Sequence, residues 1–115
     1  MNARIKKETP LIDRVKRGLI VSDDYLKSVD INSRDDRGNN ALYWAIKKKH
    51  RYNIQMLLEN KISLEVSYRI HALSHAIVCD DYGTFIEICK KDNLTFKLFK
   101  EAFFKKALFW NRYIR

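Results

Sequence analysis

The sequence has few of the residues that define several common protein classes. Only two of its 115 residues are cysteines, Cys79 and Cys89, which excludes a disulfide-rich scaffold and favours a reduced, cytoplasmic setting. The three glycines form no phosphate-binding loop and no nucleophile motif is present, so we expect no enzymatic activity. The apolar runs are only a few residues long, which argues against an integral membrane helix. No apolar segment follows the opening MNARIKKETP, so we also expect no secretory signal.

Positive charge is in excess and is unevenly distributed. Lysine and arginine number 23 against 14 acidic residues, for a formal net charge of +9 at pH 7. The excess lies in residues 1–18, 41–66 and 97–115, whereas residues 19–40 and 67–96 are slightly acidic. Such a field favours acidic partners, whether protein, nucleic acid or anionic lipid. Because 46% of the residues are hydrophobic, the composition predicts one folded domain with a modest core.

A short apolar pattern recurs every 31 residues. Four blocks share one register: PLIDRV (10–15), ALYWAI (41–46), ALSHAI (72–77) and FFKKAL (103–108). A second apolar column contains Leu26, Leu57 and Ile88. The spacing within each block is typical of helices that bury one face, and polar residues separate the two helices of each unit. A single helix–turn–helix unit cannot bury its apolar face alone, so the units are predicted to stack.

Residues 30–65 resemble an ankyrin repeat. The residues that match the family pattern are Asp35, Gly38, Leu42, Ala45, His50, Leu57 and Leu58. Asn40 and Ala41 stand where the family usually has Thr-Pro, and Lys49 replaces the glycine of the turn. The resemblance implies an all-α, ankyrin-like repeat solenoid of about three and a half helix–turn–helix units with short connecting fingers. We expect a single domain, 1–115, with units at about 8–34, 35–66 and 67–96 and a terminal capping helix at 97–115.

Ankyrin-like stacks generally bind proteins through the finger tips and the exposed side of each first helix. Carried onto this chain, the resemblance implies partner contacts from Arg34, Asp36, Arg37 and Asn39 on the second finger and from Lys16, Arg17, Trp44, Lys47, Lys48 and His75 on the first helices. Trp44 falls at the margin between the core and the concave surface. A partly exposed tryptophan flanked by basic residues would make a strong contact. The alternative is that it packs between units while the lysines are merely solvated.

Two further patterns allow chemistry but have simpler explanations. His71, His75 and Cys79 are spaced four residues apart and could hold zinc. However, His71 shares a column with Asn40 at the helix-capping position, and no fourth ligand is evident, so we expect no metal and no cofactor. The acidic pairs at 23–24 and 80–81 lie where second helices begin, and capping accounts for them without acid–base catalysis.

The last 22 residues, 94–115, are basic and aromatic. One interpretation is an amphipathic helix for an anionic membrane or an acidic partner, and another is stacking on nucleic acid. The repeat register favours a third, in which this segment seals the stack. Its surplus aromatic residues, including Trp110, would then be available for a partner or for a homodimer contact with a second copy.

The sequence therefore predicts a non-enzymatic protein–protein interaction module. It would bind an acidic protein partner through its basic concave face, as an inhibitor, an adaptor or an immunity-type protein. The alternative is a nucleic-acid-binding protein that uses the same positive face and the C-terminal basic and aromatic helix.

Overall fold

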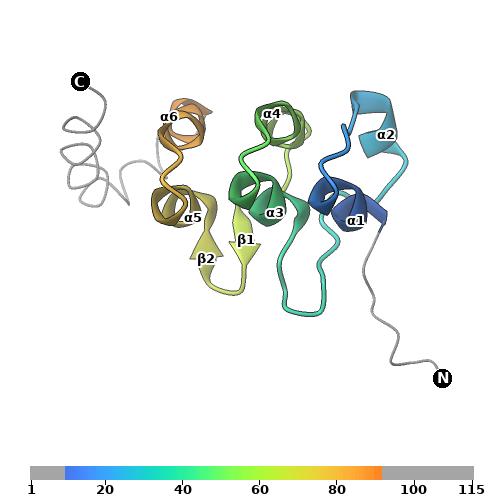
Figure 1. The fold of residues 1–115 in the computed structure, drawn as a ribbon, viewed down its shortest axis with the longest axis horizontal. Coiled ribbons are helices and arrows are strands. Elements are labelled where there is room, and N and C mark those ends of the chain that lie inside the picture. Colours follow the sequence, from blue (N-terminus) through green and yellow to red (C-terminus); the bar gives the residue numbers. More distant parts are fainter. Residues whose placement is uncertain (1–9, 92–115) are drawn as a thin grey trace.

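The computed structural model describes residues 10–91, which form three pairs of helices and one short hairpin. The elements are α1 (Pro10–Lys16), α2 (Asp23–Lys27), α3 (Ala41–Lys47), α4 (Arg51–Glu59), β1 (Glu65–Ser67), β2 (Ile70–His71), α5 (Ala72–Val78) and α6 (Tyr82–Lys91). Figure 1 shows α1, α3 and α5 side by side in one row, with α2, α4 and α6 in a second row above them. Two segments project from the first row: the loop that leads into α3, and the hairpin that leads into α5.

The predicted all-α fold class is wrong, because the described residues also contain a small antiparallel sheet. Strands β1 and β2 pair with each other, and Ser67 lies opposite Ile70 across a turn at Tyr68 and Arg69. The fold is therefore mixed, with six helices and a two-stranded sheet between residues 10 and 91. Strands of three and two residues are too short to show an alternating pattern, and the turn lacks the glycine, asparagine or aspartate that usually marks a hairpin.

The 31-residue register predicted from the sequence is present in the helices of the first row. Helices α1, α3 and α5 each span seven residues, and their first residues lie 31 positions apart. Their leucines Leu11, Leu42 and Leu73 are fully buried, and so is most of the second apolar column. Burial of each such side chain contributes about 1.5–3 kcal/mol, and the resulting core runs continuously through the three helix pairs.

The starts of α3 and α5 are each fixed by a side-chain cap. Oδ1 of Asn40 accepts a hydrogen bond from the backbone N–H of Tyr43 at 3.0 Å, and Nδ1 of His71 accepts one from Leu73 at 3.0 Å. These bonds satisfy backbone donors that have no partner inside the helix. The capping role predicted for the column of Asn40 and His71 is thus confirmed.

The first helices also end alike. Gly18, Lys49 and Asp80, again 31 residues apart, have φ angles of 76°, 57° and 58°. In each case the next residue donates its N–H back to a carbonyl five positions earlier, as His50 does to Ala45 at 3.1 Å. This left-handed turn is the usual way to stop a helix, but only the first unit has the glycine that adopts it without strain. Lys49 and Asp80 adopt the same backbone at a cost.

A buried asparagine joins the first two helix pairs. Asn53 on α4 is fully buried, donates from Nδ2 to the carbonyl of Leu19 at 2.9 Å, and accepts from the N–H of Val21 at 3.0 Å. At the next junction, Arg51 reaches α6, where it donates to Oγ1 of Thr84 at 2.9 Å. Each helix pair is therefore fixed to the next by polar contacts as well as by the core.

Candidate functional site

The ends of α1 and α3 carry exposed basic side chains in matching positions. Arg17 is exposed at the end of α1, and Lys47 and Lys48 are exposed at the end of α3. Arg17 lies 3.4 Å from Asp13 in an exposed ion pair that contributes little to stability. Neither Lys47 nor Lys48 pairs with an acidic side chain of residues 10–91. Two consecutive lysines with no acidic partner among residues 10–91 give this end of α3 a positive potential towards solvent.

Trp44 stands behind these basic residues and is only partly buried. Its Nε1 donates to Oδ2 of Asp35 at 2.9 Å, and its ring meets that of Tyr43 edge to face, with centroids 5.2 Å apart. The ammonium of Lys16 lies 4.5 Å from the centroid of the Trp44 ring, a cation–π contact that joins α1 to α3. Trp44 therefore packs between the first two units and still keeps some exposed surface, so the two alternatives considered for it are both met in part.

Asp35 fixes both the indole of Trp44 and the loop that precedes α3. Its Oδ1 accepts hydrogen bonds from the backbone N–H groups of Arg37 and Asn39, at 2.9 and 3.0 Å. Burial alone would raise the pKa of Asp35, but these hydrogen bonds, that from Trp44 and the charge of Lys16 lower it below its ordinary value. The carboxylate is thus ionised at neutral pH, and its hydrogen bonds stabilise the loop rather than contact a partner.

The four predicted contacts on this loop separate into two structural and two exposed residues. The guanidinium of Arg34 donates to the carbonyl of Gly38 at 2.9 Å and to that of Glu65 at 2.8 Å, so it ties the loop to strand β1. Asn39 is only 7% exposed and accepts a hydrogen bond from the hydroxyl of Ser67. Asp36 and Arg37 are exposed at the end of the loop and are the two that a partner can reach.

His75 is also an internal residue. It is only 6% exposed; its ring stacks on Tyr43 with centroids 4.2 Å apart, and its Nε2 lies 3.0 Å from the carbonyl oxygen of Tyr43. Burial lowers the pKa of His75, and the nearby charge of Lys47 acts in the same direction. The imidazole is therefore neutral at pH 7 and donates through Nε2. The His75 ring packs against the ring of Tyr43 and is too buried to contact a partner.

The zinc arrangement considered for His71, His75 and Cys79 does not form. His71 caps α5, whereas Sγ of Cys79 approaches His75 to 3.8 Å at the end of the same helix. Burial raises the pKa of the Cys79 thiol, which disfavours the thiolate that a metal requires. Between residues 10 and 91 no three histidine, cysteine, aspartate or glutamate side chains are grouped so that they could hold a metal ion.

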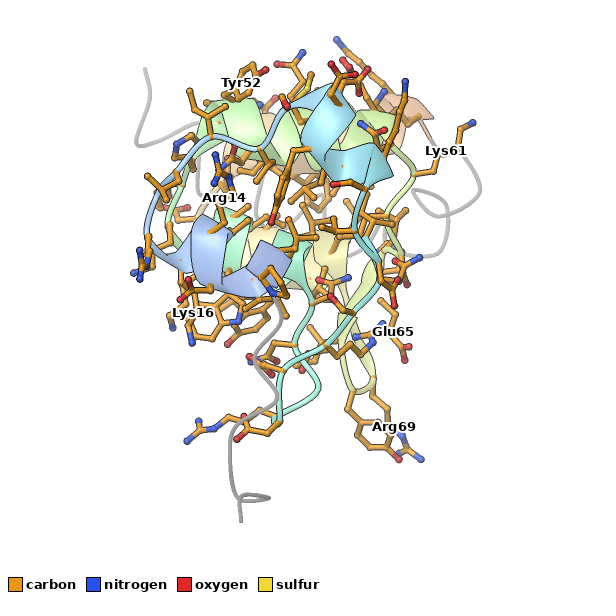
Figure 2. The ribbon with its side chains drawn as sticks, turned by 90° about the vertical axis from the view of Figure 1, so that its right-hand side faces the viewer. Arg14, Lys16, Tyr52, Lys61, Glu65 and Arg69 are labelled. Atoms are coloured by element: carbon orange, nitrogen blue, oxygen red, sulfur yellow. The ribbon has the colours of Figure 1, made fainter. Side chains whose placement is uncertain are left out.

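The structure also exposes several residues that sequence reasoning did not select. Val78 ends α5 and is 81% exposed, and Tyr68 at the hairpin turn is 73% exposed. Figure 2, which looks along the stack from the α1 end, shows Arg69 at the far tip of the hairpin and Lys16 beside α1. The register would have predicted Val78, since it occupies the same column as Lys16 and Lys47; the hairpin had no such signal.

Comparisons with family models, with curated proteins and with solved structures gave no match. In the described part of the chain, no helix has the length and apolar character needed to cross a membrane. Trp110 and the C-terminal segment predicted to cap the stack or to form a homodimer contact lie outside the described residues.

Proposed function

We propose that this protein is a non-enzymatic interaction module that binds an acidic protein partner. The observation that carries the proposal is the row of exposed basic residues at the ends of α1 and α3, with the partly exposed Trp44 behind it. The expected contacts are Arg17, Lys47 and Lys48, together with the exposed part of Trp44 and the loop residue Arg37. We also propose, from the motif in residues 30–65, that the protein is related to the ankyrin-repeat family.

The physical support is the combination of unpaired charge with a fixed aromatic ring. Lys47 and Lys48 have no acidic partner among residues 10–91, so no carboxylate of this part of the chain competes with that of a partner. Trp44 is held on one edge by Asp35 and on one face by Lys16, so little side-chain entropy remains to be lost on binding. Rigid aromatic residues surrounded by polar groups are typical of strong interface contacts.

The same geometry favours protein over nucleic acid as the partner. Stacking of a base needs an open aromatic face, and one face of Trp44 is already covered by Lys16, while its ring also meets that of Tyr43 at an interplanar angle of 75°. A carboxylate requires no such face. Nucleic acid is accordingly the competing outcome of the experiment below, with steep salt dependence and loss on nuclease treatment as its signature.

The test is affinity capture from native lysate, with and without nuclease, followed by mass spectrometry. We expect one stoichiometric acidic protein that survives nuclease. The double variant Lys47→Glu/Lys48→Glu should weaken its binding by more than about tenfold, since two attractive contacts become repulsive. The matched control is Lys90→Glu/Lys91→Glu, which makes the same charge change on exposed lysines at the end of α6. Equal losses in both variants, or recovery of nucleoproteins that nuclease removes, would contradict the proposal.

A further inference from the structure

The three first helices end in different chemistry at equivalent positions. Their last residues are Lys16, Lys47 and Val78, each 31 positions after the previous one. Val78 is 81% exposed, more than any other large apolar side chain of residues 10–91. Isolated exposed apolar residues are common on protein surfaces. Val78 differs from such cases because it continues a row whose first two members are lysines.

The next column repeats the change of chemistry. Arg17 follows Lys16 and Lys48 follows Lys47, whereas Val78 is followed by Cys79, whose thiol is partly buried and has its pKa raised by burial. Along this row, the ends of α1 and α3 are therefore cationic, whereas the end of α5 is uncharged and apolar. A ligand that lies along the row meets positive charge twice and an apolar side chain third.

The spacing of this row fits an extended chain. Helices α1, α3 and α5 lie side by side (Figure 1), and packed helices have axes roughly 8–10 Å apart. An extended segment in the polyproline II conformation advances about 3.1 Å per residue with three residues per turn, so three residues cover about 9 Å. Side chains three residues apart on such a segment lie on the same face, so each can reach the end of one helix.

We propose that the row formed by Lys16/Arg17, Lys47/Lys48 and Val78 binds an extended acidic segment of a protein partner. In that segment, two acidic positions and one apolar position follow one another at intervals of three residues. This assignment rests on the proposed function, because it specifies the sequence that an acidic partner presents. Charge complementarity selects the first two positions, and exclusion of water from Val78 selects the third. Either chain direction satisfies the spacing, so the segment reads acidic–acidic–apolar in one direction or the reverse in the other.

The experiment measures fluorescence anisotropy of labelled synthetic peptides with the full chain. The first probe contains two Glu-Glu pairs separated by one serine, followed by another serine and a leucine. The second probe has the same residues in reversed order. The controls replace the leucine with serine, or move it directly beside the second glutamate pair. We expect one leucine probe to bind about 5–10-fold more tightly than its serine control, in line with partial burial of one leucine.

Protein variants locate the two kinds of contact. Val78→Ser should remove the advantage of the leucine probe and leave the serine control unchanged, whereas Ile20→Ser, a change at another exposed apolar residue (55% exposed), should leave that advantage intact. Lys47→Glu/Lys48→Glu should weaken both probes. Because Val78 and Ile20 are exposed, neither serine substitution should disturb folding.

The outcomes separate this inference from the function on which it rests. If all glutamate probes bind equally and only the lysine variant loses binding, the proposed acidic specificity stands and the inference is overturned. An advantage of leucine that persists in Val78→Ser, or that survives moving the leucine beside the second pair, overturns it too. If no probe responds to the lysine variant, the acidic-partner proposal itself fails.

Discussion

The helices of the stack and the two segments that project from it are held by different interactions. In the helices, equivalent residues 31 positions apart are buried together, as Leu42 and Leu73 are, and each first helix ends in the same left-handed turn. The projections share no such rule. The one before α3 is an irregular loop around Asp35, and the one before α5 is a β-hairpin.

The projections depend on contacts between distant parts of the chain. The N–H of Asn40 donates to the carbonyl of Val66 at 2.9 Å, and Arg34 donates to the carbonyl of Glu65 at 2.8 Å. These bonds join residues 26 and 31 positions apart, so each projection supports the other. The 31-residue period thus fixes where the helices lie, whereas the shape of the projections depends on polar side chains that do not recur with the period.

The largest expected effect is loss of stability when the interior is truncated. Leu42→Ala removes a fully buried side chain in the middle helix pair and should reduce the free energy of unfolding by about 2–5 kcal/mol. Urea denaturation followed by circular dichroism measures it. Tyr68→Ala, at the exposed hairpin turn, is the control and should change stability by less than about 0.5 kcal/mol. Similar losses in both would abolish the distinction between interior and projection.

Arg34→Ala should loosen the projections while leaving the helices intact. It removes two hydrogen bonds to backbone carbonyls, and the expected loss of stability is about 1–2 kcal/mol. Hydrogen exchange should become faster in the hairpin and in the loop before α3, with protection of α4 unchanged. Arg37→Ala, at the exposed end of the same loop, serves as the control. Faster exchange throughout α4 in Arg34→Ala would show that the two regions unfold together.

His75 makes the interior sensitive to acid. Because burial holds its pKa below the ordinary value, the unfolded chain binds a proton more readily than the folded one. Stability is therefore full above the unfolded pKa of about 6.5 and falls as the pH drops below it, until the folded protein is protonated as well. Tyr43, Lys47 and Cys79 are the groups that surround the ring. His75→Phe should flatten the dependence of thermal stability on pH between 7 and 5, and an unchanged slope would refute this assignment.

The smallest expected effect is a gain. Lys49 has a φ of 57°, which glycine adopts without strain, so Lys49→Gly should stabilise the protein by about 0.5–1 kcal/mol after the entropy that glycine adds to the unfolded chain is deducted. The matched control is Lys48→Gly, since Lys48 has a φ of −86° and should lose stability. Thermal denaturation of the two variants should shift the midpoint in opposite directions.

The residues that could be predicted are those fixed by local pattern. The burial of Leu11, Leu42 and Leu73 followed from the repeat, and the caps at Asn40 and His71 followed from their shared column. These features depend on a few neighbouring residues and on a periodic apolar face, both of which are visible in the sequence.

The features that could not be predicted depend on contacts between distant residues. The hairpin has an atypical turn at Tyr68 and Arg69. It is fixed to the loop before α3 by a hydrogen bond from the hydroxyl of Ser67 to Oδ1 of Asn39. In the candidate site, the exposure of Lys47 and Lys48 agrees with the prediction. Asn39 and His75, by contrast, are buried by partners 28 and 32 positions away, and no local pattern marks such pairing.

The placement of Trp44 also gives the protein a built-in optical probe. Its indole N–H is bound to the carboxylate of Asp35 and its ring lies under the ammonium of Lys16, so two charges act on one chromophore. Separation of α1 from α3 would remove the cation, and any ligand against the exposed part of the ring would change the water around it. In a Trp110→Phe background, the emission of Trp44 alone then reports in real time whether this junction is closed and whether a ligand covers the exposed part of the ring.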